Sequence, residues 1–138
     1  MPERKTLERA RKAKGEGKAP TTQAGEFVRE EMEHIREGKH GARSTKQAIA
    51  IGLSKARRGA QLKPPKKAQT STHTRKSTSL ASRAYCAGQS GTRKKPSAKR
   101  SRATSRALKR EPRRAASHKA LSKQARSAAT RRRRRAIG

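Results

Sequence analysis

Apolar positions recur at helical spacing in the middle of the chain and hardly anywhere else. Val28, Met32 and Ile35 are separated by four and three residues, so they share one face of a helix. Gly38 follows that stripe and predicts the end of the helix. Since threonine is a common helix cap, Thr21 or Thr22 is expected to cap its start.

A second helix is predicted immediately after a short basic loop. The run Ser44-Thr45-Lys46-Gln47 matches a capping box, in which the first and fourth side chains satisfy each other's backbone donors. Ile49, Leu53 and Ala56 then share one face, and Gly59 ends the helix.

The two helices form a predicted hairpin over residues 22–59. Ala48, Gly52 and Ala56 are small enough to let the first helix approach the second closely. The hairpin has few large apolar side chains with which to offset the entropy of ordering. We therefore expect it to need a second copy, further helices or a bound polyanion for stability.

The segments that flank the hairpin have no comparable pattern. Residues 1–21 are polar and contain Gly15, Gly17 and Pro20, which predicts a mobile leader with a frayed helix over 3–13. Pro64-Pro65 predicts a break within a Lys-, Ser- and Thr-rich linker over residues 60–78.

Residues 79–138 are predicted to form a basic, Ala/Arg/Lys-rich tail that is helical or disordered. We expect a weak helix over 79–87, a helix from a Ser97 cap through Arg110, and an Ala-rich helix from Arg114 to about Arg131. Like charges four residues apart repel, so these helices should strengthen on a polyanion. The expected fold is all-α and partly disordered, a short helical hairpin followed by a long basic, weakly helical tail.

The amino-acid composition excludes several classes of function for this chain. Lys and Arg number 40 against nine Glu and no Asp, for a net charge of +31. Leu, Ile, Val and Phe total 12 of 138 residues, well under the roughly 20% below which high charge predicts disorder. This composition excludes a conventional enzyme core, and no run reaches the roughly 20 apolar residues of a membrane span. The N-terminus lacks the apolar region of a secretion signal, so we expect a cytoplasmic protein.

The charge is unevenly distributed along the chain. Residues 1–37 have a net charge of +1, residues 38–62 of +6 and residues 63–138 of +24. A near-neutral head with a polycationic tail is typical of a nucleic-acid-binding arm. Since duplex DNA carries one charge per about 1.7 Å, 31 charges match roughly 50 Å of helix, or about 15 base pairs.

Residues 44–58, STKQAIAIGLSKARR, lie within the longer string GEFVREEMEHIREGKHGARSTKQAIAIGLSKARRG. This string resembles the core of a family of small basic bacterial proteins of unknown function, and residues 88–126 are similar to the extended tail of its longer members. Some members are described as DNA-binding or plasmid-stabilisation proteins. The resemblance implies a bacterial cytoplasmic setting and supplies no catalytic residues.

Nucleic acid is the expected partner, DNA more than RNA, through contacts with phosphates that do not read base sequence. The expected binding residues are the basic side chains of the loop, of the second helix and of the tail. They are Lys39, Arg43, Lys46, Arg57, Arg58, Arg93, Lys94, Lys95, Lys99, Arg100, Arg102, Arg106, Lys109, Arg110, Arg113, Arg114, Arg131, Arg132, Arg133, Arg134 and Arg135.

Two interpretations of the hairpin remain open. It can be a helix-turn-helix reader of DNA, or a hairpin for packing and self-association with a solvated basic edge. A helix-turn-helix usually has a third supporting helix and a larger core, so we favour the second interpretation, with a possible homo-oligomer through residues 22–59.

Catalytic and metal chemistry find little support in the sequence. His34, His40, His73 and His118 are not paired at ligand spacing with Cys or Asp, and Cys86 is the single cysteine. No sequence motif combines a nucleophile with a general base and a third group that orients the base. We expect no enzyme activity, no metal and no cofactor.

The sequence therefore predicts a non-enzymatic, largely sequence-independent DNA-binding protein, accessory to the nucleoid or to a plasmid. The alternative is a ribosome- or RNA-associated basic protein, although two aromatic residues cannot form a base-stacking platform. Membrane binding is disfavoured, because the tail lacks an apolar face with Trp, Phe and Leu to anchor it.

Overall fold

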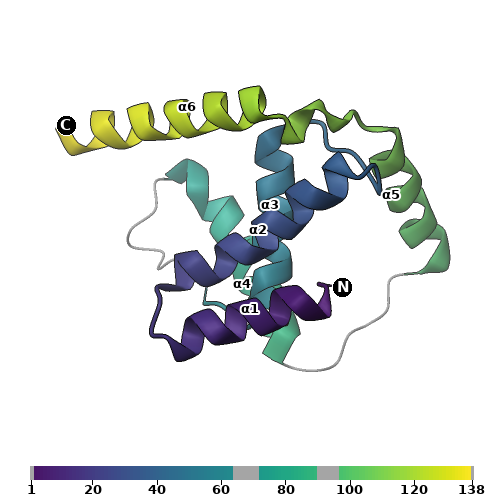
Figure 1. The fold of residues 1–138 in the computed structure, drawn as a ribbon, viewed down its shortest axis with the longest axis horizontal. Helices are drawn as coiled ribbons and strands as arrows, with labels where there is room; N and C mark the ends of the chain where they lie inside the picture. The colour runs from purple at the N-terminus through teal and green to yellow at the C-terminus, as the bar shows by residue number, and fades with distance from the viewer. Residues whose placement is uncertain (1, 64–71, 90–96, 138) are drawn as a thin grey trace. The chain divides into compact units, whose positions relative to one another are not determined.

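The computed structural model describes residues 2–63, 72–89 and 97–137 (Figure 1). Every regular element among these residues is helical, which confirms the all-α prediction for this part of the chain. The break predicted at Pro64-Pro65 lies outside the described residues. The elements are α1 (Arg4–Gly15), α2 (Pro20–Arg36), α3 (Thr45–Gly59), α4 (Thr72–Gln89), α5 (Ala98–Arg110), the 3₁₀ helix η2 (Arg113–Ala116) and α6 (His118–Ile137).

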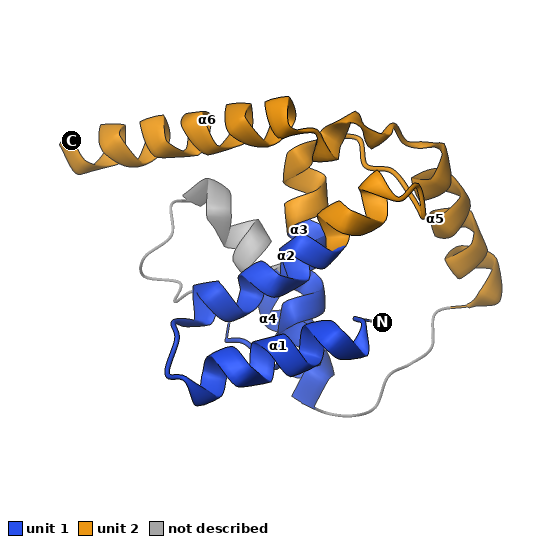
Figure 2. Ribbon diagram, in the orientation of Figure 1, with its two compact units in different colours: residues 1–30, 50–96 blue, residues 31–49, 97–138 orange. Residues whose placement is uncertain are grey.

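The chain divides into two compact units (Figure 2). Unit 1 comprises residues 1–30 and 50–96, and unit 2 comprises residues 31–49 and 97–138. Both α2 and α3 contribute residues to each unit, so these units differ from the four consecutive segments that composition predicts.

In unit 1, α1 is part of the core. Thr6, Ala10 and Ala13 are buried, and Ala10 clusters with Phe27 and Ala56. The polar composition of residues 1–21 predicts a mobile leader instead. Alanine and threonine at spacings of four and three give a weak apolar signal, and Ala10 is buried in a cluster with Phe27 that the local sequence does not reveal.

The first turn of α2 also differs from the prediction. Pro20 is its first residue, and the backbone N–H of Thr22 donates to the carbonyl of Ala19 at 2.9 Å. Neither Thr21 nor Thr22 is therefore the cap. Proline suits the first helical position, because its missing N–H would have no partner within the helix there.

Helices α2 and α3 touch at Gly52 within unit 1. A Cβ atom added to Gly52 would lie 2.7 Å from the Cα of Val28. The absence of a side chain at this position permits the close approach that the sequence predicts for the small residues of the second helix.

Helix α4 is longer than the sequence predicts. It begins at Thr72, within the expected linker, and includes Gly88, where a Cβ atom would lie 2.7 Å from the carbonyl oxygen of Arg58. Ala81 and Ala84 are buried. Small side chains on α4 allow this close packing in unit 1.

In unit 2, α2 ends as predicted at Gly38. The residue has a φ of +79°, a left-handed conformation that costs glycine little. Its N–H donates to the carbonyl of Ile35 at 3.2 Å, and the N–H of Lys39 donates to the carbonyl of His34 at 3.0 Å. These two bonds form a Schellman motif.

The loop after α2 pairs with the segment after α5. The N–H of Gly41 donates to the carbonyl of Leu108 at 2.8 Å, and that of Ala42 donates to the carbonyl of Pro112 at 3.1 Å. A Cβ atom on Gly41 would collide with the backbone carbonyl of Glu111. Only glycine fits this approach.

The predicted helix over 114–131 begins later and ends later in the structure. Residues 113–116 form η2, and α6 runs from His118 to Ile137. The Ser117 hydroxyl accepts the N–H of Ala120 at 3.2 Å and thereby caps α6. The helix expected from Ser97 is observed, with Ser97 accepting the N–H of Arg100 at 3.3 Å.

Candidate nucleic-acid interface

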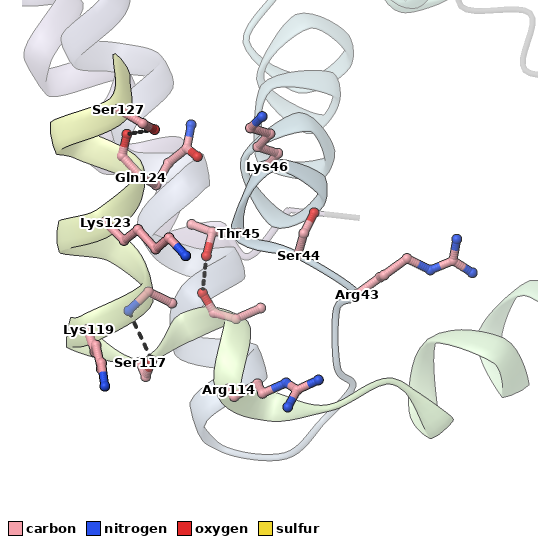
Figure 3. A pocket seen from close by; sticks show the side chains of 12 residues that line it. Arg43, Ser44, Thr45, Lys46, Arg114, Ser117, Lys119, Lys123, Gln124 and Ser127 are labelled. Carbon is pink, nitrogen blue, oxygen red and sulfur yellow. Dashed lines mark hydrogen bonds between the residues drawn. The ribbon is translucent and has the colours of Figure 1, made fainter. Parts of the chain in front are cut away.

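An open cavity of about 690 Å³ lies in unit 2 where α3 and α6 begin (Figure 3). Its lining comes from the start of α3, from η2 and from one face of α6. Among the lining side chains are five cations and four hydroxyls, and no carboxylate. The lining residues are Arg43, Ser44, Thr45, Lys46, Arg114, Ala115, Ser117, Lys119, Ala120, Lys123, Gln124 and Ser127.

Two helix N-termini contribute to this cavity. Ser44 caps α3 by accepting the N–H of Gln47 at 3.2 Å, as the capping box predicts. The reciprocal bond is displaced by one residue, because the Gln47 side chain accepts the N–H of Arg43 at 2.7 Å. Ser117 caps α6. The positive ends of two helix dipoles therefore add to the lysine and arginine charges, an arrangement that suits an anion.

The basic side chains of the cavity have little internal compensation. Arg43 approaches Glu111 at 3.8 Å, but its side chain is 84% exposed, so this ion pair contributes little. Lys46, Arg114 and Lys123 line the same cavity. Phosphate oxygens are the hydrogen-bond acceptors that arginine and lysine prefer in such positions.

The basic lining continues along one face of α6. Lys123, Ser127, Arg131 and Arg134 follow one another at spacings of four, four and three residues. From Lys119 to Arg134 the helix rises about 22 Å, which corresponds to about 13 phosphate charges of duplex DNA. All five arginines over 131–135 are exposed.

Helix α5 has a basic face of its own and no buried residue. Five of its predicted binding residues lie within an arc of about 100°, and Arg100 lies beside them. All six are exposed, and the half-buried Leu108 lies on the opposite side of the helix. The five are Lys99, Arg102, Arg106, Lys109 and Arg110.

Several predicted binding residues lie away from the cavity. Arg57 and Arg58 belong to unit 1, and burial lowers the pKa of Arg57 from its ordinary value. In unit 2, Lys39 forms an ion pair with Glu37 at 2.9 Å. The guanidinium of Arg113, in η2, lies 3.1 Å from the position that a Cβ atom would occupy on Gly38. The predicted residues Arg93, Lys94 and Lys95 lie outside the described part of the chain.

Two basic residues of the cavity are absent from the sequence prediction. Lys119 and Lys123 extend the basic lining along α6. The available signal was a serine cap at 117 followed by lysines four residues apart, which share a helix face. Placing the helix start at Arg114 instead of Ser117 obscured that register.

A second cluster brings together histidines that the sequence analysis regards as unpaired. Glu31, His34 and His40 each place a ligand atom within 4.8 Å of the other two. The Nε2 atom of His40 lies 2.9 Å from a carboxylate oxygen of Glu31. The expectation of no metal ligands in this chain depended on spacing along the sequence, whereas the loop after Gly38 returns His40 to α2.

Comparisons of this chain with protein-family models, curated proteins and solved structures found no match. Among the described helices, none combines the length and the apolar character needed to cross a membrane. What the chain does is therefore inferred from its own residues.

Proposed function

We propose that this chain is a non-enzymatic protein that binds the phosphate backbone of DNA without reading its base sequence. The observation that carries the proposal is the cavity where α3 and α6 begin, with five basic and no acidic lining residues. Two capped helix N-termini and the exposed basic faces of α5 and α6 also favour a polyanionic partner.

The energetics support a phosphate-binding role. Each lysine or arginine that neutralises a phosphate releases condensed counterions, which makes binding favourable and strongly dependent on salt. A cavity at the junction of Arg43, Arg114 and Lys119 can hold one phosphate, while the face of α6 follows the next ones along a strand.

The described aromatic residues argue against base stacking as the mode of binding. Phe27 is completely buried in the core of unit 1, and Tyr85, the other aromatic residue of the sequence, is half-buried on α4 and cannot form a stacking platform alone. Proteins that bind single strands or RNA loops usually stack bases on exposed aromatic rings. Contacts with phosphates leave base edges unread, so little sequence preference is expected.

The cellular setting and the assembly are part of the same proposal. The family resemblance of residues 25–59 supports a bacterial cytoplasmic protein, accessory to the nucleoid or to a plasmid. Residues 63–138 would act as a long basic tail whose weak helices become ordered on the polyanion, and residues 22–59 would supply self-association. The +24 charge of that tail supports this division.

A salt titration on random duplex DNA tests the proposal. The triple variant Arg114→Gln, Lys119→Gln and Lys123→Gln should reduce the slope of log K against log[salt] by about 2.7. The matched control, Arg11→Gln, Lys12→Gln and Lys14→Gln, removes the same charge from exposed positions of α1 and should leave the slope nearly unchanged. Equal slopes for the two variants would contradict binding at the cavity.

The ribosome- or RNA-associated alternative involves the same contacts with phosphates. Identification of the nucleic acid that is recovered with the protein after crosslinking in cells distinguishes it from the DNA-binding proposal. Chromosomal or plasmid DNA supports the proposal. A predominance of ribosomal RNA would indicate that the cavity and the basic face of α6 bind RNA instead of DNA.

A further inference from the structure

Three potential metal ligands meet at the end of α2 in unit 2. Glu31 and His34 are three residues apart, so both lie on one face of the helix. The Schellman motif at Gly38 then reverses the chain and returns His40 to the same place. The ligand atoms of all three residues lie within 4.8 Å of one another.

The environment of His40 fixes what its ring presents to Glu31. Its Nδ1 atom lies 3.0 Å from the carbonyl oxygen of Gly41, so Nδ1 carries a proton and donates it. Nε2, which lies 2.9 Å from a carboxylate oxygen of Glu31, is therefore the ring atom that can coordinate an ion beside that carboxylate.

A backbone carbonyl that binds the second ring nitrogen is the usual support for a metal-ligating histidine. It orients the ring and selects the tautomer whose other nitrogen is free to coordinate. The carbonyl of Gly41 has this role, and the N–H of the same residue is held by Leu108. The carbonyl of Gly41 therefore orients the His40 ring, and the backbone of Gly41 is itself held in place by Leu108.

The carboxylate of the cluster is deeply buried. The side chain of Glu31 is 2% exposed and that of His40 is 17% exposed. A buried carboxylate is expensive unless positive charge lies beside it. A divalent ion bound here would add positive charge beside that carboxylate.

An ion can reach the cluster from solvent. His40 also lines an open cavity of about 460 Å³, whose charged lining residues are two acidic ones, Glu37 and Glu111, and two basic ones, Lys109 and Arg113. Water or an exogenous ligand can occupy a fourth coordination position from that side. With Zn–N and Zn–O distances of about 2.0–2.2 Å, the ligand atoms of a tetrahedral site lie about 3.3–3.6 Å apart, so a pair at the 4.8 Å limit would have to close by about 1.4 Å, shared between two side chains.

We propose that Glu31, His34 and His40 bind a divalent transition-metal ion of the zinc type. Two imidazoles and one carboxylate suit zinc, cobalt or nickel, whereas calcium and magnesium require more oxygen ligands. The ion would fasten the loop after Gly38 to α2, and Arg43 of the phosphate cavity lies three residues further along that loop.

The test is a titration of the untagged, chelator-treated full-length protein with Zn²⁺ and, for its visible spectrum, with Co²⁺. We expect one ion per chain with a tetrahedral Co²⁺ spectrum. His34→Gln and His40→Gln should each weaken binding by about 100-fold or more, since even second-shell changes cost 10–100-fold. His118→Gln removes an exposed histidine of α6 and should leave the affinity within about twofold.

A measurement on the unmodified protein keeps the test independent of folding in the variants. Ring ¹⁵N resonances should shift for His34 and His40 on addition of Zn²⁺, while those of His73 and His118 stay in place. No binding by the unmodified protein, equal shifts at all four rings, or equal loss in His118→Gln and His40→Gln would overturn the proposal. The cluster would then be a contact between His40 and Glu31 that binds no metal ion.

Discussion

Thr45 and Ala115 are joined by a hydrogen bond although 70 residues separate them in the chain. The Thr45 hydroxyl donates to the carbonyl of Ala115 at 2.6 Å in a buried position. The neighbouring carbonyl, of Ala116, accepts the Nε–H of Arg36 at 3.0 Å. The first bond holds η2 against the start of α3, where the cavity of Figure 3 lies, and the second holds η2 against the end of α2.

Replacing the Thr45 hydroxyl by a methyl group should destabilise unit 2. Thr45→Val keeps the shape of the side chain and leaves the Ala115 carbonyl buried without this donor, a loss of about 1–3 kcal/mol in the free energy of unfolding. Chemical denaturation measures it. The control is Thr104→Val, whose exposed hydroxyl bonds only to the Arg100 carbonyl of its own helix, and its cost should stay under about 0.5 kcal/mol.

Two glycines in helix interiors should respond to alanine with opposite signs. Gly52→Ala would place Cβ 2.7 Å from the Cα of Val28, so the α2 and α3 backbones must separate at a cost of about 1–3 kcal/mol. Gly25 has no atom within 4 Å of its Cβ position, and Gly25→Ala should stabilise the protein by about 0.5–1 kcal/mol. Thermal unfolding of both variants checks the pair, and a gain in stability for Gly52→Ala would refute the close contact.

The buried carboxylate of Glu30 should be coupled to Lys55. Glu30 is 2% exposed, accepts the N–H of Glu3 at 3.1 Å, and lies 3.4 Å from the Lys55 ammonium. Lys55→Met leaves that charge without its cation and should cost about 1–3 kcal/mol. In a Glu30→Gln background the same change should cost less. A double-mutant cycle by chemical denaturation measures the difference, and additive effects would exclude the coupling.

The arginines at the end of α6 should contribute unequally to DNA binding. Arg131 and Arg134 continue the face that lines the cavity, whereas Arg132 and Arg133 point about 130° away from it on either side. Arg131→Gln with Arg134→Gln should reduce the slope of log K against log[salt] by about 1.8. Arg132→Gln with Arg133→Gln removes equal charge and should reduce it less. Identical slopes would indicate that the helical face does not organise binding.

Local signals along the chain predicted several element boundaries correctly. Gly38 ends α2, Ser44 caps α3, and Ser97 begins a helix that runs through Arg110. Each of these features depends on residues within one or two turns, so the sequence contains the whole cause. Prediction failed at Pro20 and at residues 114–117, where more than one start of the helix was compatible with the local residues.

The burial of α1 could not be predicted in the same way. Ala10 and Ala13 are buried beside a core that contains Phe27, yet alanine gives almost no apolar periodicity by itself. The same limit applies to Gly41, whose requirement for glycine comes from the carbonyl of Glu111.

The sequence by itself determined that the described chain is helical, where α3 and α5 begin and end, and that the positive charge is concentrated beyond residue 62. Tertiary structure decided which of those charges meet. Arg43 and Lys46 line one cavity with Arg114 and Lys123 because η2 bonds to Thr45 through a backbone carbonyl. Every residue type has a backbone carbonyl, so a contact of this kind cannot be predicted from the pattern of side chains.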